Sequence, residues 1–377
     1  METIIDNITY HLNANQNNAT VIKPATQYVG ALSIPKQIVH NDVSYCVEYI
    51  EAFAFSDCSL LTSVSIPDSI VKIGQFAFSN CSSLTSITNI SARFIDCCAF
   101  DNCRNLISVK INLDEIPKGY DQKFGRQVQE YIIGERVIRI QPDAFWYSNK
   151  LKSFKVVSSN TIYCSIDGVL FNKDATLLIK YPQGAISKIY TIPKSVVFIG
   201  ESAFKECTNL TSIVIPESVV TIGKFAFKSC YNLTEVNLPD SIININDGAF
   251  LRCTSITSFN IPNSVQNIGK AAFNCCNSMN LIKIGNGIHE INEATFSDCE
   301  SLTSIDIPNN IIIISPGAFI RCTKLKQITL GDSITTIGHS AFKHCKSLEQ
   351  IIVPMEKKLH FKKILASEGV NEIIIGQ

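Results

Sequence analysis

The chain has 377 residues, equal numbers of acidic and basic residues, and 46% hydrophobic residues. Balanced charge argues against nucleic acid as a partner, and this apolar content is too high for a disordered protein. The first twenty residues lack the basic and apolar regions of a secretory signal, and no apolar run is long enough to span a membrane. We therefore expect a folded chain without a transmembrane segment.

Residues 1–50 are predicted to form an N-terminal β cap. The Ile34-Pro35 step matches the strand ends found later in the chain, and the segment from Val47 to Ile50 matches the apolar segment after each of those strands. Between them, Asn41-Asp42 indicates a hairpin turn. This β-structure would close the first coil of the neighbouring repeat region.

A repeat of 23 residues dominates residues 51–354. Its clearest mark is a phenylalanine that recurs seven times at this fixed spacing, from Phe204 to Phe342. Within one coil the recurring positions are Phe204, Cys207, Leu210, Ile213 and Ile215. Such a fixed period predicts a solenoid, in which each coil is closed by its neighbours.

Two parts of the repeat region depart from this period. Residues 112–133 have Gly125 at the cysteine position and predict a degenerate coil. That coil keeps three strand positions, Val128, Tyr131 and Ile133. Residues 158–190 are too long for one coil, and their two β-rich runs around residues 172–174 predict an inserted hairpin. The count is then 13 coils, one of which carries the insertion.

Within a coil, an alternating apolar pair followed by proline predicts a strand, because proline lacks an N–H and ends a ladder. Stacked strands would form one parallel sheet along the repeat region. A second apolar pair is followed by glycine, as at Gly74 and Gly223, or by Asp or Asn. These residue types predict a left-handed backbone at that position. The Ala-Phe step and the cysteine are predicted to form one helical turn.

Residues 355–377 are predicted to form a C-terminal cap with a helix. Leu359, Ile364 and Leu365 would face inward, and Gly369 would end the helix. Its lysines are Lys357, Lys358, Lys362 and Lys363. They predict a solvated face, with contact to an anionic surface as the alternative.

Fifteen cysteines raise the question of disulfides or metal. Ten of them share one repeat position: Cys58, Cys81, Cys103, Cys207, Cys230, Cys253, Cys276, Cys299, Cys322 and Cys345. Stacking places these in a line about 5 Å apart, which cannot form a tetrahedral zinc site. Their side chains run side by side and do not face each other as a disulfide requires. We expect a reduced, buried column, with redox function or bridges between coils as the alternative.

The pattern CxxLxxIxIPxSVxxIGxxAFxx resembles the BspA-like leucine-rich repeat family (Treponema-pallidum-type leucine-rich repeats) over about residues 33–354. The resemblance implies an α/β, right-handed, curved solenoid of about 13 coils, with a parallel sheet on the concave face and short helical turns and strands elsewhere. The hairpin near 158–190 is similar to an insertion that recurs in this family.

The same resemblance implies a non-enzymatic scaffold for protein binding or cell adhesion. Relatives occur in surface proteins of bacteria and protist parasites, so it implies a cell-surface antigen that binds a host or extracellular-matrix protein. The absence of an export signal and the many thiols favour the alternative of an intracellular scaffold. No catalytic motif such as HExxH, GxSxG or a Walker loop is present, and no cofactor or metal site is predicted.

The candidate site is therefore the outward surface of the concave strands. Six outward side chains are larger than the serine and threonine side chains around them or carry a charge: Val214, Glu235, Asn237, Asn260, Lys283 and Asp306. Such side chains would carry the specificity for a partner. The hairpin from Phe171 to Lys180 is the rival site, since insertions on rigid scaffolds often carry binding.

Overall fold

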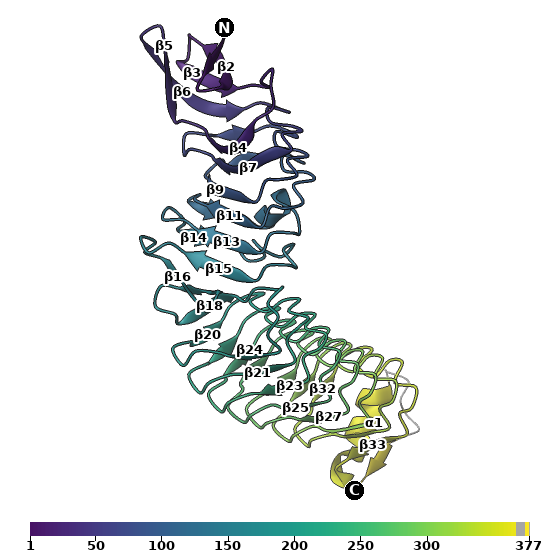
Figure 1. The fold of residues 1–377 in the computed structure, drawn as a ribbon. Helices are drawn as coiled ribbons and strands as arrows, with labels where there is room; N and C mark the ends of the chain where they lie inside the picture. The colour runs from purple at the N-terminus through teal and green to yellow at the C-terminus, as the bar shows by residue number, and fades with distance from the viewer. Residues whose placement is uncertain (367–373, 377) are drawn as a thin grey trace. The chain divides into compact units, whose positions relative to one another are not determined.

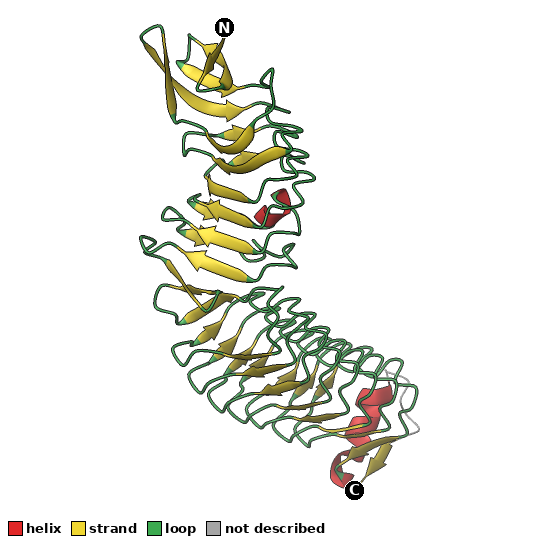
Figure 2. Cartoon of the chain, in the orientation of Figure 1, coloured by secondary structure: helices red, strands yellow, loops and turns green. Residues whose placement is uncertain are grey.

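The computed structural model describes residues 1–366 and 374–376, in two compact units, 1–173 and 174–377. The regular elements of both units are mostly strands, joined by many turns and loops, and helix is sparse (Figures 1 and 2). The predicted leucine-rich repeat solenoid of about 13 coils is confirmed. The boundary between the units falls inside the insertion predicted near 158–190. Division into cap, solenoid and cap remains a proposal based on the repeat pattern.

Six parallel strands form the inner sheet of the first unit, in the order β15-β13-β11-β9-β7-β4. They are β4 (Val29–Ser33), β7 (Leu60–Ser65), β9 (Ser86–Ile90), β11 (Ser108–Ile111), β13 (Glu130–Ile133) and β15 (Ser153–Val156). The predicted degenerate coil supplies β13, in which Tyr131 lies opposite Val109 of β11. This coil has therefore kept its strand, as the sequence predicts.

A second sheet of the first unit joins the N-terminal strands to the short strands of the coils. It contains β1 (Glu2–Ile5), β2 (Ile8–Asn13), β3 (Asn18–Val21), β5 (Gln37–His40), β6 (Val43–Ile50), β8 (Lys72–Ile73) and β10 (Phe94–Ile95). β12 (Glu115–Ile116) and β14 (Arg139–Ile140) form a separate pair. The hairpin β5–β6 turns at Asn41 and Asp42, whose φ angles of 49° and 61° confirm the predicted turn.

The insertion contains the two predicted β-rich runs on either side of residues 172–174, and the first run is itself a hairpin. β16 (Tyr163–Ile166) and β17 (Val169–Asn172) pair antiparallel and turn at Asp167-Gly168, where both φ angles are positive. Asp-Gly is among the strongest short-range hairpin signals. The turn predicted around residues 172–174 is confirmed, because residues 173–175 turn the chain between β17 and the next strand, β18 (Leu177–Lys180).

The second unit contains the regular coils. Its inner strands fall into three groups: β19 (Ile189–Thr191), β21 (Ser212–Val214) and β23 (Glu235–Asn237); β25 (Ser258–Asn260) and β27 (Leu281–Lys283); and β29 (Ser304–Asp306), β31 (Gln327–Thr329), β33 (Gln350–Val353) and β34 (Ile374–Gly376). The expectation of one continuous sheet is wrong here. Three-residue strands leave few ladder hydrogen bonds to hold neighbouring coils together along this face.

The other short strands of the second unit form two parallel groups. These are β18 (Leu177–Lys180), β20 (Phe198–Ile199), β22 (Thr221–Ile222), β24 (Asn244–Ile245) and β26 (Asn267–Ile268); and β28 (Glu290–Ile291), β30 (Ile313–Ile314) and β32 (Thr336–Ile337). Their second residue is buried in each coil, so this ladder closes the opposite side of the core.

The glycine after these strands is required for space, and the prediction of a left-handed backbone there is wrong. Gly74 and Gly223 do not have positive φ, but a Cβ on Gly223 would lie 2.6 Å from the Ile199 carbonyl oxygen of the preceding coil. The positive φ occurs two residues later, as at Phe225, and again just before the cysteine, as at Ser229. These two residues make the Ala-Phe segment a pair of tight turns instead of the expected helical turn.

Phenylalanine rings form a column through the core. Phe227 stacks on Phe204 at 4.9 Å and on Phe250 at 5.1 Å between ring centroids, with interplanar angles of 10° and 2°. In the degenerate coil, the 3₁₀ helix η1 (Tyr120–Lys123) brings Phe124 into the column, 5.5 Å from Phe100. In this coil the stacked ring thus comes from a different position of the repeat than in the regular coils.

The C-terminal helix is only partly as predicted. After η2 (Met355–Lys357), helix α1 (Lys358–Ala366) buries Phe361 and Leu365, while Leu359 is 69% exposed. The inward assignment of Leu359 is wrong because residues four apart share a helix face, and Phe361 with Leu365 defines the buried one. The side chain of Ile364, and Gly369, lie outside what the structure describes.

The lysines of this cap are divided between two environments. Lys362 and Lys363 are exposed, and the Lys357 ammonium donates a hydrogen bond to the Asp332 carbonyl. Among the described helices, none has the length and apolar character needed to cross a bilayer.

Candidate protein-interaction surface

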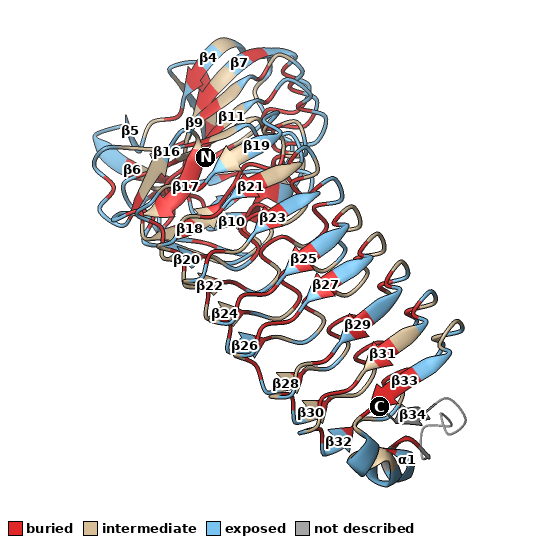
Figure 3. Cartoon of the chain, turned by 90° about the horizontal axis from the view of Figure 1, so that it is seen from below, coloured by how far each residue is buried: buried red, intermediate tan, exposed pale blue. Residues whose placement is uncertain are grey.

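All six predicted site residues are exposed and lie on β21, β23, β25, β27 and β29 (Figure 3). Each strand has a buried central residue, so the residues on both sides of it point outward. We call the six residues Val214, Glu235, Asn237, Asn260, Lys283 and Asp306 the inner-strand surface. The alternating pattern predicted this exposure correctly.

Strand register brings some of these residues together and leaves others apart. Val214 lies opposite Asn237, and Asn260 lies opposite Lys283. Asp306 lies opposite Thr329, and no ladder pairing is found between β27 and β29 in the described part of the chain. The inner-strand surface therefore consists of three neighbouring groups of side chains, not one uninterrupted row.

The charged members of the inner-strand surface have no partners within the described part of the chain. Within the described residues, Glu235, Lys283 and Asp306 form no ion pair and no side-chain hydrogen bond. Exposed charges without partners are available to another molecule without first breaking an internal contact.

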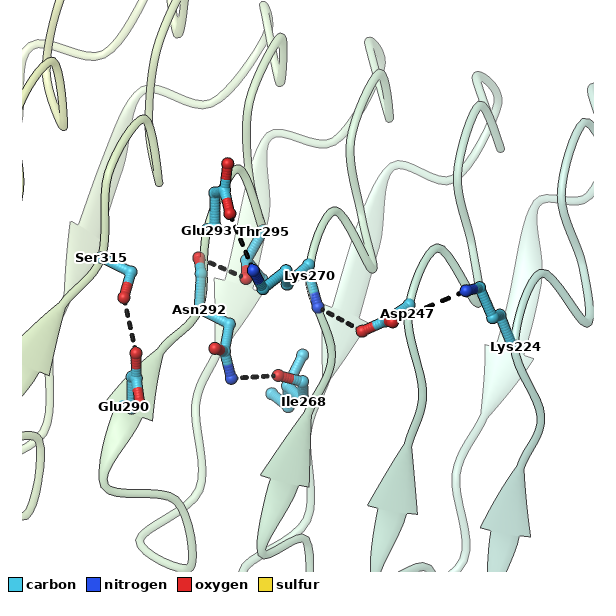
Figure 4. A network of polar contacts seen from close by, with 9 residues as sticks. All are labelled: Lys224, Asp247, Ile268, Lys270, Glu290, Asn292, Glu293, Thr295 and Ser315. Carbon is cyan, nitrogen blue, oxygen red and sulfur yellow. Dashed lines mark hydrogen bonds and ion pairs between the residues drawn. The ribbon is translucent and has the colours of Figure 1, made fainter.

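A different row of charges on the second unit is satisfied internally (Figure 4). Lys224, Asp247, Lys270 and Glu293 occupy one repeat position in successive coils, with alternating sign. Lys224 Nζ lies 4.0 Å from Asp247 Oδ2, the Lys270 backbone N–H donates to Asp247 Oδ1 at 2.9 Å, and Lys270 Nζ lies 3.0 Å from Glu293 Oε2. The hydrogen bond to Glu293 and its charge raise the pKa of Lys270. Exposed pairs contribute little stability, so this row adds little to the free energy of folding.

The same region shows why asparagine replaces the repeat glycine. Asn292 Nδ2 donates to the Ile268 carbonyl of the preceding coil at 2.8 Å, and Thr295 Oγ1 donates to the Asn292 carbonyl at 2.8 Å (Figure 4). Asn292 therefore acts by bonding across coils and not by adopting positive φ.

All fifteen cysteines are unbridged. Nine of the ten in the column are buried, each at 2% exposure or less, as predicted for the column. Their hydrogen bonds were not predicted. Cys230 Sγ donates to the Phe204 carbonyl at 3.0 Å, and Cys253 Sγ to the Phe227 carbonyl at 3.1 Å. Burial raises the pKa of Cys207 to about 12, and raises the pKa of Cys230 well above its ordinary value. These thiols stay protonated, which makes them poor nucleophiles.

A family model for the BspA type leucine rich repeat region, with six copies, matches residues 43–174, 183–301 and 243–368. This chain belongs to the BspA-type leucine-rich repeat family. A search of curated proteins found no match.

Solved bacterial structures share the BspA-type fold of this chain. A leucine-rich repeat protein from Bacteroides ovatus is 24% identical, with a TM-score of 0.63 over 100% of this chain and 99% of that one. The pneumococcal vaccine antigen PcpA is 22% identical, with a TM-score of 0.57 over 100% and 98%. A leucine-rich repeat protein from Eubacterium ventriosum is 22% identical, with a TM-score of 0.52 over 93% and 90%.

The rival site in the BspA-type insertion offers little accessible surface. In β17, Val169, Leu170 and Phe171 are buried. In β18, Lys180 is buried and its ammonium donates to the Ser202 carbonyl at 2.9 Å. The insertion therefore contributes to the core, and the inner-strand surface is the better candidate.

In the described residues, no three His, Cys, Asp or Glu side chains are grouped so that they could hold a metal ion. The BspA-type family is one of repeat scaffolds, in which neighbouring coils build an extended surface.

Proposed function

We propose that this BspA-type chain is a non-enzymatic scaffold that binds a protein partner through its inner-strand surface, in adhesion at a cell surface. One observation carries the proposal: six larger or charged side chains stand exposed on five successive strands, and the charged ones have no internal partner among the described residues. The coils behind the strands hold them in place. Few supporting side chains therefore have to become ordered when a partner binds.

The chemistry of the inner-strand surface suits a protein partner. It combines an apolar group at Val214, amides at Asn237 and Asn260, and charges of both signs. Leu281, on β27, is 61% exposed and adds apolar area beside Lys283. A mixed surface of this kind gives specificity through charge and amide contacts, with apolar groups contributing affinity.

The cell-surface part of the proposal is supported by the family. The resemblance to BspA-like repeats implies a surface protein, and PcpA, which shares the fold, is described as a vaccine antigen. A host or extracellular-matrix protein is the proposed class of partner.

The free thiols favour a second function, an intracellular interaction scaffold. Cys97 and Cys98 are exposed and unbridged. Exposed thiols persist in reducing compartments and tend to oxidise outside the cell. Surface biotinylation of intact cells, followed by detection of this chain, decides between the two locations: labelling supports adhesion, and protection until lysis supports the intracellular scaffold.

Partner binding is tested with matched quadruple variants of the full chain. The site variant is Glu235→Ala, Asn237→Ala, Lys283→Ala and Asp306→Ala; the control is Glu217→Ala, Asp240→Ala, Gln266→Ala and Lys324→Ala. All control residues are exposed residues of the second unit outside the inner strands. The proposal expects a partner isolated from host extracellular matrix to bind the site variant at least tenfold more weakly, about 1.4 kcal/mol, with the control unchanged. Equal affinity for both variants would contradict it.

A further inference from the structure

Two consecutive turns of the first unit are shorter than their neighbours. Four turns of this unit connect an inner strand to a short strand: 66–73, 90–95, 111–116 and 133–140. The turns 90–95 and 111–116 are each two residues shorter than the other two. Ladder pairing makes the four segments equivalent, since β7, β9, β11 and β13 pair in order. The shortening therefore removes material from one face in two adjacent coils.

A groove lies where these residues are missing. β10 pairs with β8 and β12 pairs with β14, but β10 and β12 do not pair within the described residues. The groove has a volume of about 720 Å³ and is lined by residues of all four turns. This volume is in the range of about 300–1,000 Å³ typical of binding pockets.

Apolar side chains are unusually exposed along the groove. Phe94 is 57% exposed, Ile138 is 62% exposed and Val71 is 42% exposed, and all three line it. Leu113 also lines the groove but is buried, so it forms part of the base. Three large apolar groups gathered around one hollow form a patch that a partner could cover.

The unbalanced charge at the groove is positive. Each lining carboxylate already contacts a cation: Asp68 with Lys36 at 3.2 Å, Asp114 with Arg136 at 3.0 Å, and Glu115 with Arg139 at 3.8 Å. Arg93, exposed and next to Phe94, forms no ion pair or side-chain hydrogen bond within the residues that the structure describes. A guanidinium beside apolar surface is suited to a carboxylate carried on an apolar body.

We propose that this groove binds a short extended segment of a partner protein, in which an acidic residue is flanked by apolar ones. The groove crosses four stacked turns, or three strand spacings, which is roughly 14 Å and corresponds to about four extended residues. The carboxylate pairs with Arg93, and the flanking side chains cover Phe94, Val71 and Ile138. The groove lies in the first unit, so it is independent of the inner-strand surface of the second.

The probe is a displayed library of random seven-residue peptides, selected on the full chain. We expect enriched sequences to place Asp or Glu between apolar residues. One enriched peptide, labelled with fluorescein, is then measured by fluorescence anisotropy. Arg93→Glu is expected to weaken its binding at least tenfold, while Arg104→Glu, an exposed arginine between the same two short turns but outside the groove lining, changes it less than twofold.

A second variant tests the shape of the groove. Inserting Asp-Ser between Ser91 and Ala92 restores the first short turn to full length, which fills the hollow and should abolish peptide binding. Thermal unfolding of each variant checks the fold, and Phe94→Ser supplies an independent loss of affinity if the insertion does not fold.

Several outcomes would overturn the proposal. They are enrichment of peptides without an acidic residue, equal effects of Arg93→Glu and Arg104→Glu, or retained binding in a folded insertion variant. Full displacement of the peptide by octanoate at equal affinity would assign the groove to small apolar acids instead. The quadruple inner-strand variant should bind the peptide normally, so failure of this inference and failure of the proposed function are distinguished.

Discussion

Neighbouring coils are held together by different contacts in the two units. Inner strands of the first unit have four to six residues and share one continuous sheet, although coil lengths there vary. Inner strands β21 to β31 of the second unit have three residues and fall into three sheets, although the 23-residue period is strict. Regular sequence spacing and continuous strand pairing are therefore separate properties.

The strict period of the second unit preserves the contacts of its turns instead. The Phe227 N–H donates to the Ala249 carbonyl at 2.7 Å, and the Phe227 carbonyl accepts from Cys253 Sγ. In the first unit the degenerate coil lacks the cysteine, but β13 pairs over four residues with both β11 and β15. Longer strands thus replace turn contacts where the repeat is irregular.

Among the changes that test this difference between the two units, deleting one coil should have the largest effect. Removing Ile215 to Asn237, one full period of 23 residues, should leave a cooperative fold, because the remaining coils keep their register. Removing Ile215 to Leu238 adds one residue and should abolish cooperative unfolding of the second unit, since a one-residue slip exchanges buried and exposed faces. Circular dichroism during thermal unfolding measures both; identical melting would contradict the dependence on register.

Alkaline pH should destabilise the second unit strongly. Burial raises the pKa of five of its column thiols: Cys207, Cys230, Cys253, Cys276 and Cys299. Because unfolded cysteine has a pKa of about 8.5, above that pH the unfolded state loses protons that the folded state keeps, so stability falls as pH rises. From pH 7.5 to 9.5 the loss is about 1.4 kcal/mol per thiol and about 7 kcal/mol for five.

Urea unfolding at pH 7.5, 8.5 and 9.5 measures this loss. The double variant Cys253→Ala and Cys276→Ala should reduce the pH dependence by about two fifths. A pH dependence equal to that of the unsubstituted chain would show that these thiols do not remain protonated in the folded state.

Phe227→Ala should destabilise the second unit by about 3–5 kcal/mol, because it removes a fully buried ring that stacks on both neighbours. The matched control is Phe198→Ala, which removes a ring that is 47% exposed and should cost much less. Urea unfolding gives both values. Similar losses for the two variants would mean that the phenylalanine column contributes little.

Thiol labelling should give the smallest perturbation and separates exposed from buried cysteines. Cys97 and Cys98 of the first unit should react with a maleimide in the native protein, whereas Cys230 and Cys253 should react only after denaturation. Peptide mass mapping after labelling identifies each site. Rapid native labelling of the buried pair would argue against their burial.

The sequence predicted those features that depend on periodicity. Exposure of Glu235 and Lys283 follows from alternation along a strand, and the strand of the degenerate coil was found from Tyr131 and Ile133. The binding role of the inner-strand surface remains a proposal, because periodicity identifies a face and not its ligand.

Features that depend on contact between coils could not be predicted in the same way. Gly223 was assigned to backbone conformation because its neighbour in space, Ile199, belongs to another coil. The groove left a visible signal, since Phe78 and Phe100 are 22 residues apart and not 23. That spacing alone did not show where the residues were missing, because β9 also gains a residue through a bulge.

The thiol hydrogen bond has a consequence for how such a chain can change length in evolution. Cys230 donates to the coil before it, and the carbonyl of Phe227, in the same coil, accepts from the coil after it. A coil with this arrangement presents a donor to one neighbour and the matching acceptor to the other. Duplicating or losing 23 codons within the regular region therefore joins compatible surfaces, and the gene can lengthen or shorten by recombination without compensating substitutions.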